Sequence, residues 1–315
     1  MSSYTKEQLL ELLGQFEERH DKMPTRREMR AEFGVTEDPF MRVFGGWSAA
    51  KEEYLGKKFR GTEGKWSTTL VVPDAHVSPG QNFRRFEKAG RLIAERRPDR
   101  IVLMGDWTNM DSLSNWDLTK SGLMEGRRYV EDMTAAKEAL GLLLNPMKEI
   151  RGYNPQVVYI IGNHELRGER YLETRPELKE HINLIKDLGL KEFGITDIVP
   201  YRENIEIEGT LFTHAPQNAA NQPVTGKYAI HRAAEQTAKS VVFAHTHRKE
   251  GVNYYRHGGD TIIQVNTFGA FFEHTDAYAY GGLNAYWRGL AILTHWAPGR
   301  YDVEEIALER LLQMY

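Results

Sequence analysis

The sequence contains no cysteine, so disulfide bonds and thiolate metal ligands are excluded. Any metal ion must therefore be bound by His, Asp, Glu, Asn or water. No apolar run approaches the roughly 20 residues that a membrane-spanning helix needs, and residues 1–13 are charged and lack the apolar segment of a secretory signal. These absences predict an intracellular, cytoplasmic protein without a membrane partner.

Several catalytic signatures are also missing. The chain has no Gly-x-x-x-x-Gly-Lys-Ser/Thr loop, no Gly-x-Ser-x-Gly elbow and no dinucleotide-binding glycine pattern after a strand. A nucleotide-cofactor enzyme is therefore disfavoured. The formal net charge of −3 argues against a surface that is basic throughout, but it does not exclude a local basic groove.

The first part of the 315-residue chain predicts a small helical domain. Apolar residues recur with helical spacing between positions 9 and 16. Thr25 and Glu28 form a capping-box pattern for a second helix that Gly34 can end, and a third short helix is expected up to Tyr54. The charged, glycine-rich stretch 56–65 indicates a linker. We therefore expect a small domain at 1–58, a linker at 59–66 and a large domain at 67–315.

From residue 66 onward, short apolar runs alternate with helical stretches, as in α/β proteins. The expected strands are 69–72, 100–104, 156–161, 210–213 and 240–244. The expected helices are 82–96, 127–150, 178–188 and 227–239. Because parallel strands deliver the residues that follow them to one edge of the sheet, ligands are expected at the carboxyl ends.

Polar residues follow each of the five strands directly. They are Asp74 and His76, then Asp106, then Asn163 with His164 and Glu165, then His214, and finally His245 and His247. Oxygen and imidazole ligands of this kind suit two divalent ions about 3.5–4 Å apart, with a carboxylate between them. We expect the pairs spaced two apart to point to one side because the chain is extended there.

Isolated histidines are more often surface residues or hydrogen-bonded core residues than ligands. This interpretation applies to the six histidines outside the strand-end set, which are His20, His181, His231, His257, His274 and His295. Five polar elements in order, each at a strand end, are a much more specific signal than any single one.

These elements resemble the five ordered motifs of the calcineurin-like metallophosphoesterase family, and the match extends from about Thr69 to the end. The resemblance implies an α/β fold, a four-layer α/β/β/α sandwich, here preceded by a small all-α, helix-turn-helix-like domain. It also implies two divalent metal ions, with manganese the first choice and Fe, Zn, Ni, Co or Mg as alternatives. Ala244 stands where the family usually has Gly, a change that removes no ligand.

The resemblance also assigns roles to residues. Asp74, His76 and His247 would bind one metal, Asn163, His214 and His245 the other, and Asp106 would bridge them. His164 would stabilise the transition state or protonate the leaving oxygen. Arg167 and Arg248 either hold a phosphate oxygen or are solvated charges beside the cleft. Asn109, with Asp111 as the less favoured substitute, fills the family's position beyond the bridging carboxylate.

Residues 4–56 resemble the small helical repeat found beside homing endonuclease domains, which suggests nucleic acid as a partner. Lys22, Arg26, Arg27 and Arg30 would then contact phosphates. The basic and acidic residues of this segment balance, so an ordinary solvated face or a protein-docking module stays open.

The carboxyl-terminal part is rich in aromatic residues, among them Tyr280, Tyr286, Trp287 and Trp296. They either pack a second sheet, which we favour, or stack on bases. Together with the segment 162–167, this part resembles phosphoesterases encoded in bacteriophage genomes, which would act in the host cytoplasm.

The predicted function is a two-metal phosphodiesterase or nuclease acting on nucleic acid. The alternatives are a phosphodiesterase or phosphatase for small or cyclic nucleotides, a phosphoprotein phosphatase, and a binding module without activity on the same fold. The sequence fixes neither the metal nor the substrate.

Overall fold

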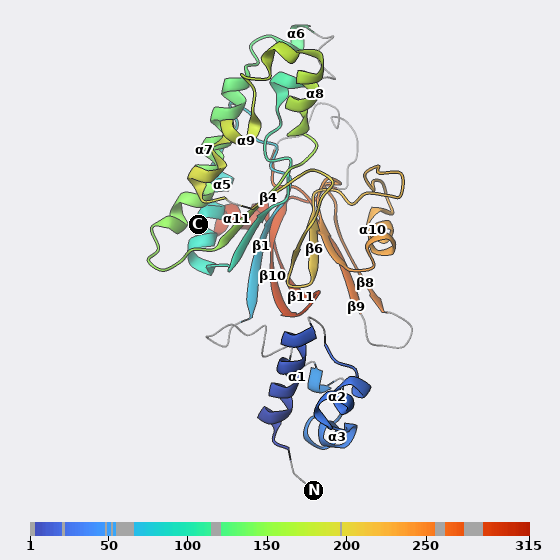
Figure 1. Cartoon of the computed structure of the whole chain (residues 1–315). Helices are drawn as coiled ribbons and strands as arrows, with labels where there is room; N and C mark the ends of the chain where they lie inside the picture. The colour runs from blue at the N-terminus through green and yellow to red at the C-terminus, as the bar shows by residue number, and fades with distance from the viewer. Residues whose placement is uncertain are drawn as a thin grey trace.

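The computed structural model describes residues 4–20, 23–47, 49–51, 53–54, 66–114, 121–195, 197–255, 262–273 and 286–315. Lys22, His257, His274, Tyr280 and nearly all of the predicted linker lie outside the described residues. Two β-sheets stand face to face in the centre of the molecule, and helices flank them (Figure 1).

The first sheet has six strands in the order β11-β10-β1-β2-β3-β4. Strands β1 to β4 run parallel, β10 pairs antiparallel with β1, and β11 pairs antiparallel with β10 at the edge of the sheet. The bounds are β1 (Ser67–Val72), β2 (Arg100–Leu103), β3 (Gln156–Ile160), β4 (Asp197–Val199), β10 (Gly289–Ala297) and β11 (Arg300–Ala307).

The second sheet has five strands in the order β5-β6-β7-β9-β8. Its central strands β6, β7 and β9 are parallel, whereas β5 and β8 pair antiparallel at the two edges. The bounds are β5 (Ile205–Ile207), β6 (Thr210–Thr213), β7 (Ser240–Phe243), β8 (Lys249–Tyr255) and β9 (Ile262–Phe268).

Alternating side chains build the layers, because successive residues of a strand point to opposite faces. On β1, Leu70 and Val72 pack toward the helices, whereas Val71 packs between the two sheets. On β7, Val242 lies between the sheets and its neighbours Val241 and Phe243 face the other side. Each central strand is therefore buried on both faces, which explains its continuous apolar run.

Helices cover both outer faces. The first sheet is covered by α5 (Arg84–Arg96), α7 (Tyr129–Lys148) and α11 (Leu308–Met314), and the second by α10 (Ala229–Thr237). The four-layer α/β/β/α sandwich expected from the sequence is confirmed. No helix among the described residues is long and apolar enough to cross a membrane.

The amino-terminal helices have a hydrophobic core of their own, formed by residues between Leu9 and Ala50. They are α1 (Lys6–His20), α2 (Arg26–Phe33) and α3 (Glu37–Phe44), with further helical turns in the described residues between 47 and 54. The predicted capping box of Thr25 and Glu28 is present, and Gly34 ends α2 with a φ of 68°. The helix α3 was not predicted.

The predicted helix 178–188 is wrong. The structure has a short 3-10 turn at Pro176–Leu178 and a separate helix α9 (Leu184–Leu188), which begins where Asn183 caps the Lys186 amide. The longer helix of this region is α8 (Leu166–Thr174), which starts directly after the polar residues of β3. The remaining short elements are η1 (Asp111–Leu113), α6 (Ser121–Met124) and η3 (Leu190–Phe193).

Candidate metal centre

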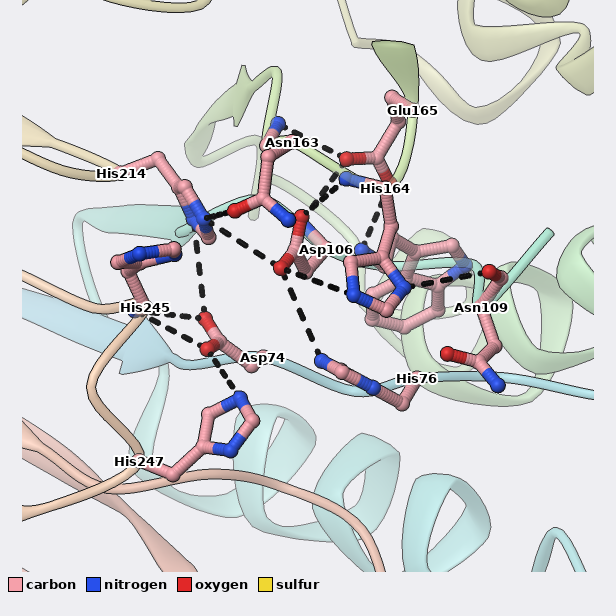
Figure 2. Close-up of polar contacts among 12 residues, drawn as sticks. Asp74, His76, Asp106, Asn109, Asn163, His164, Glu165, His214, His245 and His247 are labelled. Atoms are coloured by element: carbon pink, nitrogen blue, oxygen red, sulfur yellow. Dashed lines mark hydrogen bonds and ion pairs between the residues drawn. The ribbon is translucent and has the colours of Figure 1, made fainter. Parts of the chain in front are cut away.

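The polar residues that follow β1, β2, β3, β6 and β7 converge at the carboxyl ends of these strands, as the sequence predicted. Figure 2 shows their side chains pointing toward one another around Asp106. Most of these side chains are buried. Asp74, His76, Asp106 and His214 are each at most 2% exposed. Asn163 and His245 are partly exposed.

The first group consists of Asp74, His76 and His247, whose possible ligand atoms all lie within 4.8 Å of one another. His247 Nε2 is 2.9 Å from Asp74 Oδ2. The Asp74 carboxylate also accepts a hydrogen bond from the His245 backbone N–H at 3.0 Å. This carboxylate is therefore held between the two histidines that follow β7.

The second group consists of Asp106, His214 and His245, whose possible ligand atoms also lie within 4.8 Å of one another. His214 Nε2 lies 3.4 Å from Asp106 Oδ2 and 3.1 Å from Asn163 Oδ1. Asp106 also belongs to a third group, with His76 and His164. Asp106 thus belongs to two of the three groups, and its bridging role and the individual ligand assignments stay predictions.

Turns, not strand alternation, bring the paired residues together. His76, His245 and His247 have positive φ angles of 44°, 68° and 55°, as does Asp106 at 47°. The expectation that these pairs lie on extended chain is therefore wrong. Left-handed backbone is uncommon for residues other than glycine, and such strain concentrates at functional sites, where the surrounding fold enforces it.

Gly162 permits the close approach of two loops. A Cβ atom at this position would lie 2.1 Å from Asp106 Oδ1 and 2.2 Å from the Asp106 nitrogen. The Asp106 carboxylate in turn accepts a hydrogen bond from the His164 backbone N–H at 2.8 Å. The loops after β2 and β3 can therefore share Asp106 only because residue 162 has no side chain.

Glu165 supports these loops, a role that the sequence did not assign. Its buried carboxylate accepts hydrogen bonds from four backbone N–H groups and from a tyrosine hydroxyl. The donors are Asp106 N at 2.9 Å, Trp107 N at 2.7 Å, Thr108 N at 3.2 Å, Gly162 N at 2.8 Å and Tyr159 Oη at 3.1 Å. Burial raises the pKa of Glu165 to about 7, as does the charge of Asp106.

Arg85 supports the first loop from behind, and no sequence pattern indicated it. This buried guanidinium donates to Phe271 O at 3.0 Å, Asn82 O at 2.8 Å, Gln81 Oε1 at 2.9 Å and Ala75 O at 3.4 Å. Burial lowers the pKa of Arg85 to about 10. Because Ala75 lies between two predicted ligands, Arg85 fixes the loop that carries them.

The centre couples carboxylates and imidazoles electrostatically. Burial by itself would raise the pKa of Asp106, but the neighbouring rings of His214 and His164 hold it well below its ordinary value. Burial would lower the pKa of His214, but Asp106 raises it to about 10. The pKa of His245 falls to about 4 because of burial and the nearby His214. The Asp106 carboxylate therefore stays charged.

The predicted catalytic residue His164 is held by two of the predicted substrate-binding residues. Its Nδ1 donates to the Asn109 backbone oxygen at 3.2 Å, and Arg167 Nη2 lies 3.3 Å from its Nε2. Arg167 Nη1 donates to the same Asn109 oxygen at 2.8 Å. The Asn109 side chain donates instead to Asp111. Burial lowers the pKa of His164, and its Nε2 lies 3.9 Å from Asp106 Oδ2.

Other predicted residues lie outside the three ligand groups. Arg248, one third exposed, is 3.9 Å from Glu250. Tyr286 packs its ring against His247 with centroids 4.8 Å apart, and Trp287 packs against the core between the sheets. His295 is buried, and its Nε2 lies 3.0 Å from the Thr69 hydroxyl oxygen, as expected for a hydrogen-bonded core histidine.

The donor set fits divalent metal ions. Imidazole nitrogens together with carboxylate and amide oxygens suit borderline cations such as Mn²⁺, Fe²⁺ and Zn²⁺. The residues come from separate loops. Within each of the three groups, the possible ligand atoms lie within 4.8 Å of one another. Buried carboxylates in such a cluster are stabilised by a cation that they share.

Comparison with known proteins identifies both parts of the chain. Residues 67–281 match the family model described as calcineurin-like phosphoesterase, and residues 4–54 match the homing endonuclease associated repeat. Similar solved structures include Vps29 from Chaetomium thermophilum, with 9% identity, a TM-score of 0.38, and coverage of 76% of this chain and 97% of that chain. A dimetal phosphatase from Danio rerio has 10% identity, a TM-score of 0.33, and coverage of 77% and 96%. No curated protein matches.

Proposed function

Because the chain belongs to the calcineurin-like phosphoesterase family, we propose that this metal-dependent phosphoesterase hydrolyses phosphodiester bonds of nucleic acid. The observation that carries the choice of substrate is the match of residues 4–54 to the homing endonuclease associated repeat. A metal-dependent hydrolase joined to such a repeat is best suited to a polynucleotide. Manganese is the proposed metal.

The residues gathered around Asp106 would hold divalent ions, which would activate water near neutral pH and offset charge at phosphorus. Asp106 contributes the carboxylate between the two ligand groups, and Gly162 and Glu165 fix its position. His164 faces the same carboxylate, with its Nε2 3.9 Å from Asp106 Oδ2. Protonated at both nitrogens, the ring would donate from Nε2 to a phosphate or leaving-group oxygen and from Nδ1 to the Asn109 carbonyl.

The helix α2 offers the phosphate contacts of the amino-terminal part. Arg26, Arg27 and Arg30 are all exposed on it. Arg26 forms an ion pair with Glu37 at 2.8 Å, an exposed pair that contributes little stability and can exchange for a phosphate. Such contacts add affinity without sequence specificity.

Salt dependence of binding tests this part of the proposal. We expect replacement of all three arginines by Gln to weaken binding of double-stranded DNA and to reduce the slope of log K against log salt by about 2 to 3. A control variant replaces three exposed arginines outside α2, Arg151, Arg232 and Arg310, and should keep the wild-type slope. Equal slopes in both variants would show that α2 makes no phosphate contact.

A substrate panel tests the reaction itself. With Mn²⁺, the full chain should cleave DNA or RNA oligonucleotides faster than a cyclic nucleotide, a phosphoserine peptide or 4-nitrophenyl phosphate. Preference for the cyclic nucleotide or for the peptide would replace the proposed substrate by that class.

A further inference from the structure

A fourth parallel strand of the first sheet delivers residues to the edge that holds the metal centre. Strand β4 pairs parallel with β3, so the residues after Val199 emerge beside those after β3. These residues are Pro200, Tyr201 and Arg202. None of them belongs to the metal groups described above, and the strand itself, with only three residues, was not predicted.

Tyr201 lies beside the second metal group. Its ring centroid is 6.1 Å from that of His214, and the side chain is only partly buried. Burial raises the pKa of Tyr201, as does the charge of Asp106. An aromatic face of this kind, next to a metal ligand and open to solvent, can receive a flat substrate group.

One arginine accompanies the ring. The guanidinium carbon of Arg202 is 5.7 Å from the Tyr201 ring centroid, and Arg202 has a left-handed backbone with φ of 73°. Arg202 is exposed. Its charge opposes that of the buried Asp106 carboxylate, which makes this side of the centre attractive to anions.

We propose that Tyr201 and Arg202 form a nucleotide subsite beside the metal centre. The Tyr201 ring stacks on the base of the nucleotide that carries the scissile phosphate, and the Arg202 guanidinium contacts the adjoining phosphate. Stacking tolerates every base because each has a π-face, and arginine matches phosphate oxygens in geometry and charge. This subsite rests on the proposed function, since a polynucleotide supplies both a base and an adjoining phosphate.

The ring distinguishes this subsite from a simple anion site. Arginines alone would serve a phosphoprotein as well as a nucleotide, because both present phosphate oxygens. A partly exposed tyrosine adjacent to a ligand adds a stacking surface that a small phosphomonoester does not use. Substrates with and without a base therefore separate the roles of the ring and of the charges.

The experiment compares kcat/KM of the Mn²⁺-loaded full chain for a short oligothymidylate and for methyl 4-nitrophenyl phosphate. We expect Tyr201→Ala to lower kcat/KM for the oligothymidylate roughly 5- to 150-fold, the effect of one stacked base, and to affect the methyl ester much less. Tyr201→Phe should restore the oligothymidylate rate, because stacking does not need the hydroxyl. Arg202→Gln should flatten the salt dependence for the oligothymidylate.

Tyr255→Ala is the matched control, because this tyrosine is 69% exposed on β8 and lies outside the centre. It should leave both rates at the wild-type level. The subsite is overturned if Tyr201→Ala lowers both rates equally, if it lowers neither, or if Tyr201→Phe loses as much as Tyr201→Ala. A wild-type chain that hydrolyses the methyl ester but not the oligothymidylate overturns the proposed function, and the subsite with it.

Discussion

Gly162→Ala adds one methyl group where the structure has no room for it. The new Cβ would lie 2.1 Å from Asp106 Oδ1 and 2.8 Å from Asp106 Cγ. Ordinary carbon contacts begin near 3.5 Å, so the shared carboxylate or the loop after β3 must move by more than about 1 Å. A misplacement of this size in a catalytic site costs roughly 10²-fold in rate.

The matched control is Gly168→Ala, six residues further along the chain. A Cβ there meets Met110 Cε at 3.6 Å, an ordinary contact, and the residue lies within α8. Alanine is favoured over glycine in a helix by about 1 kcal/mol. We therefore expect Gly168→Ala to keep full activity and to be as stable as the wild type or more so.

The assay measures manganese content and hydrolysis of bis(4-nitrophenyl) phosphate for the two variants and the wild type. Gly162→Ala should lose activity roughly 10²-fold and bind metal more weakly, while circular dichroism shows an intact fold. Metal content and activity within twofold of the wild type would refute the view that the bare backbone of Gly162 positions Asp106.

Asp106→Asn should abolish turnover in a folded protein, because an amide cannot balance two cations; more than a tenth of wild-type activity at matched metal loading would refute its shared position. His164→Ala should keep all bound metal, measured by elemental analysis, and lose roughly 10²- to 10⁴-fold in rate on a substrate with a poor leaving group. Glu165→Gln leaves at least two buried N–H donors without an acceptor and should lower the free energy of unfolding by about 2–6 kcal/mol, measured by urea titration. Burial, with the charge of Arg100, lowers the pKa of His295 to about 4, so the unfolded chain binds the extra proton and stability is lost as pH falls from 6.5 to 4. His295→Gln should reduce this acid-induced loss in the free energy of unfolding by up to about 3 kcal/mol. If the variant and the wild type lose the same free energy of unfolding between pH 6.5 and 4, His295 is not the group responsible.

The predictions that succeeded rest on local patterns with a direct structural cause. Strands buried on both faces have continuous apolar runs, and the polar residues after them meet because parallel strands end at one edge. Asp74, Asp106 and His214 could therefore be placed at a common site from the sequence. The capping box of Thr25 and Glu28 succeeded for the same reason, because its hydrogen bonds lie within one turn.

The features that escaped prediction depend on contacts between distant segments. Glu165 has no distinctive neighbours in sequence, and its acceptor role appears only when the loops after β2 and β3 meet. The left-handed backbone of His76 and His245 is imposed by the fold, since neither residue favours it. Strand β4, which precedes Tyr201, is too short to show an alternating pattern. The domain boundaries and the ligand assignments stay predictions.

Metal dependence is the central claim, and reconstitution of the full chain tests it most directly. Protein dialysed against a chelator should lose hydrolysis of bis(4-nitrophenyl) phosphate while staying folded, because the ligands come from loops outside the hydrophobic cores. Titration with Mn²⁺ should restore activity, with full recovery at two bound ions per chain. Undiminished hydrolysis by the chelated protein, with no metal bound, would contradict the account.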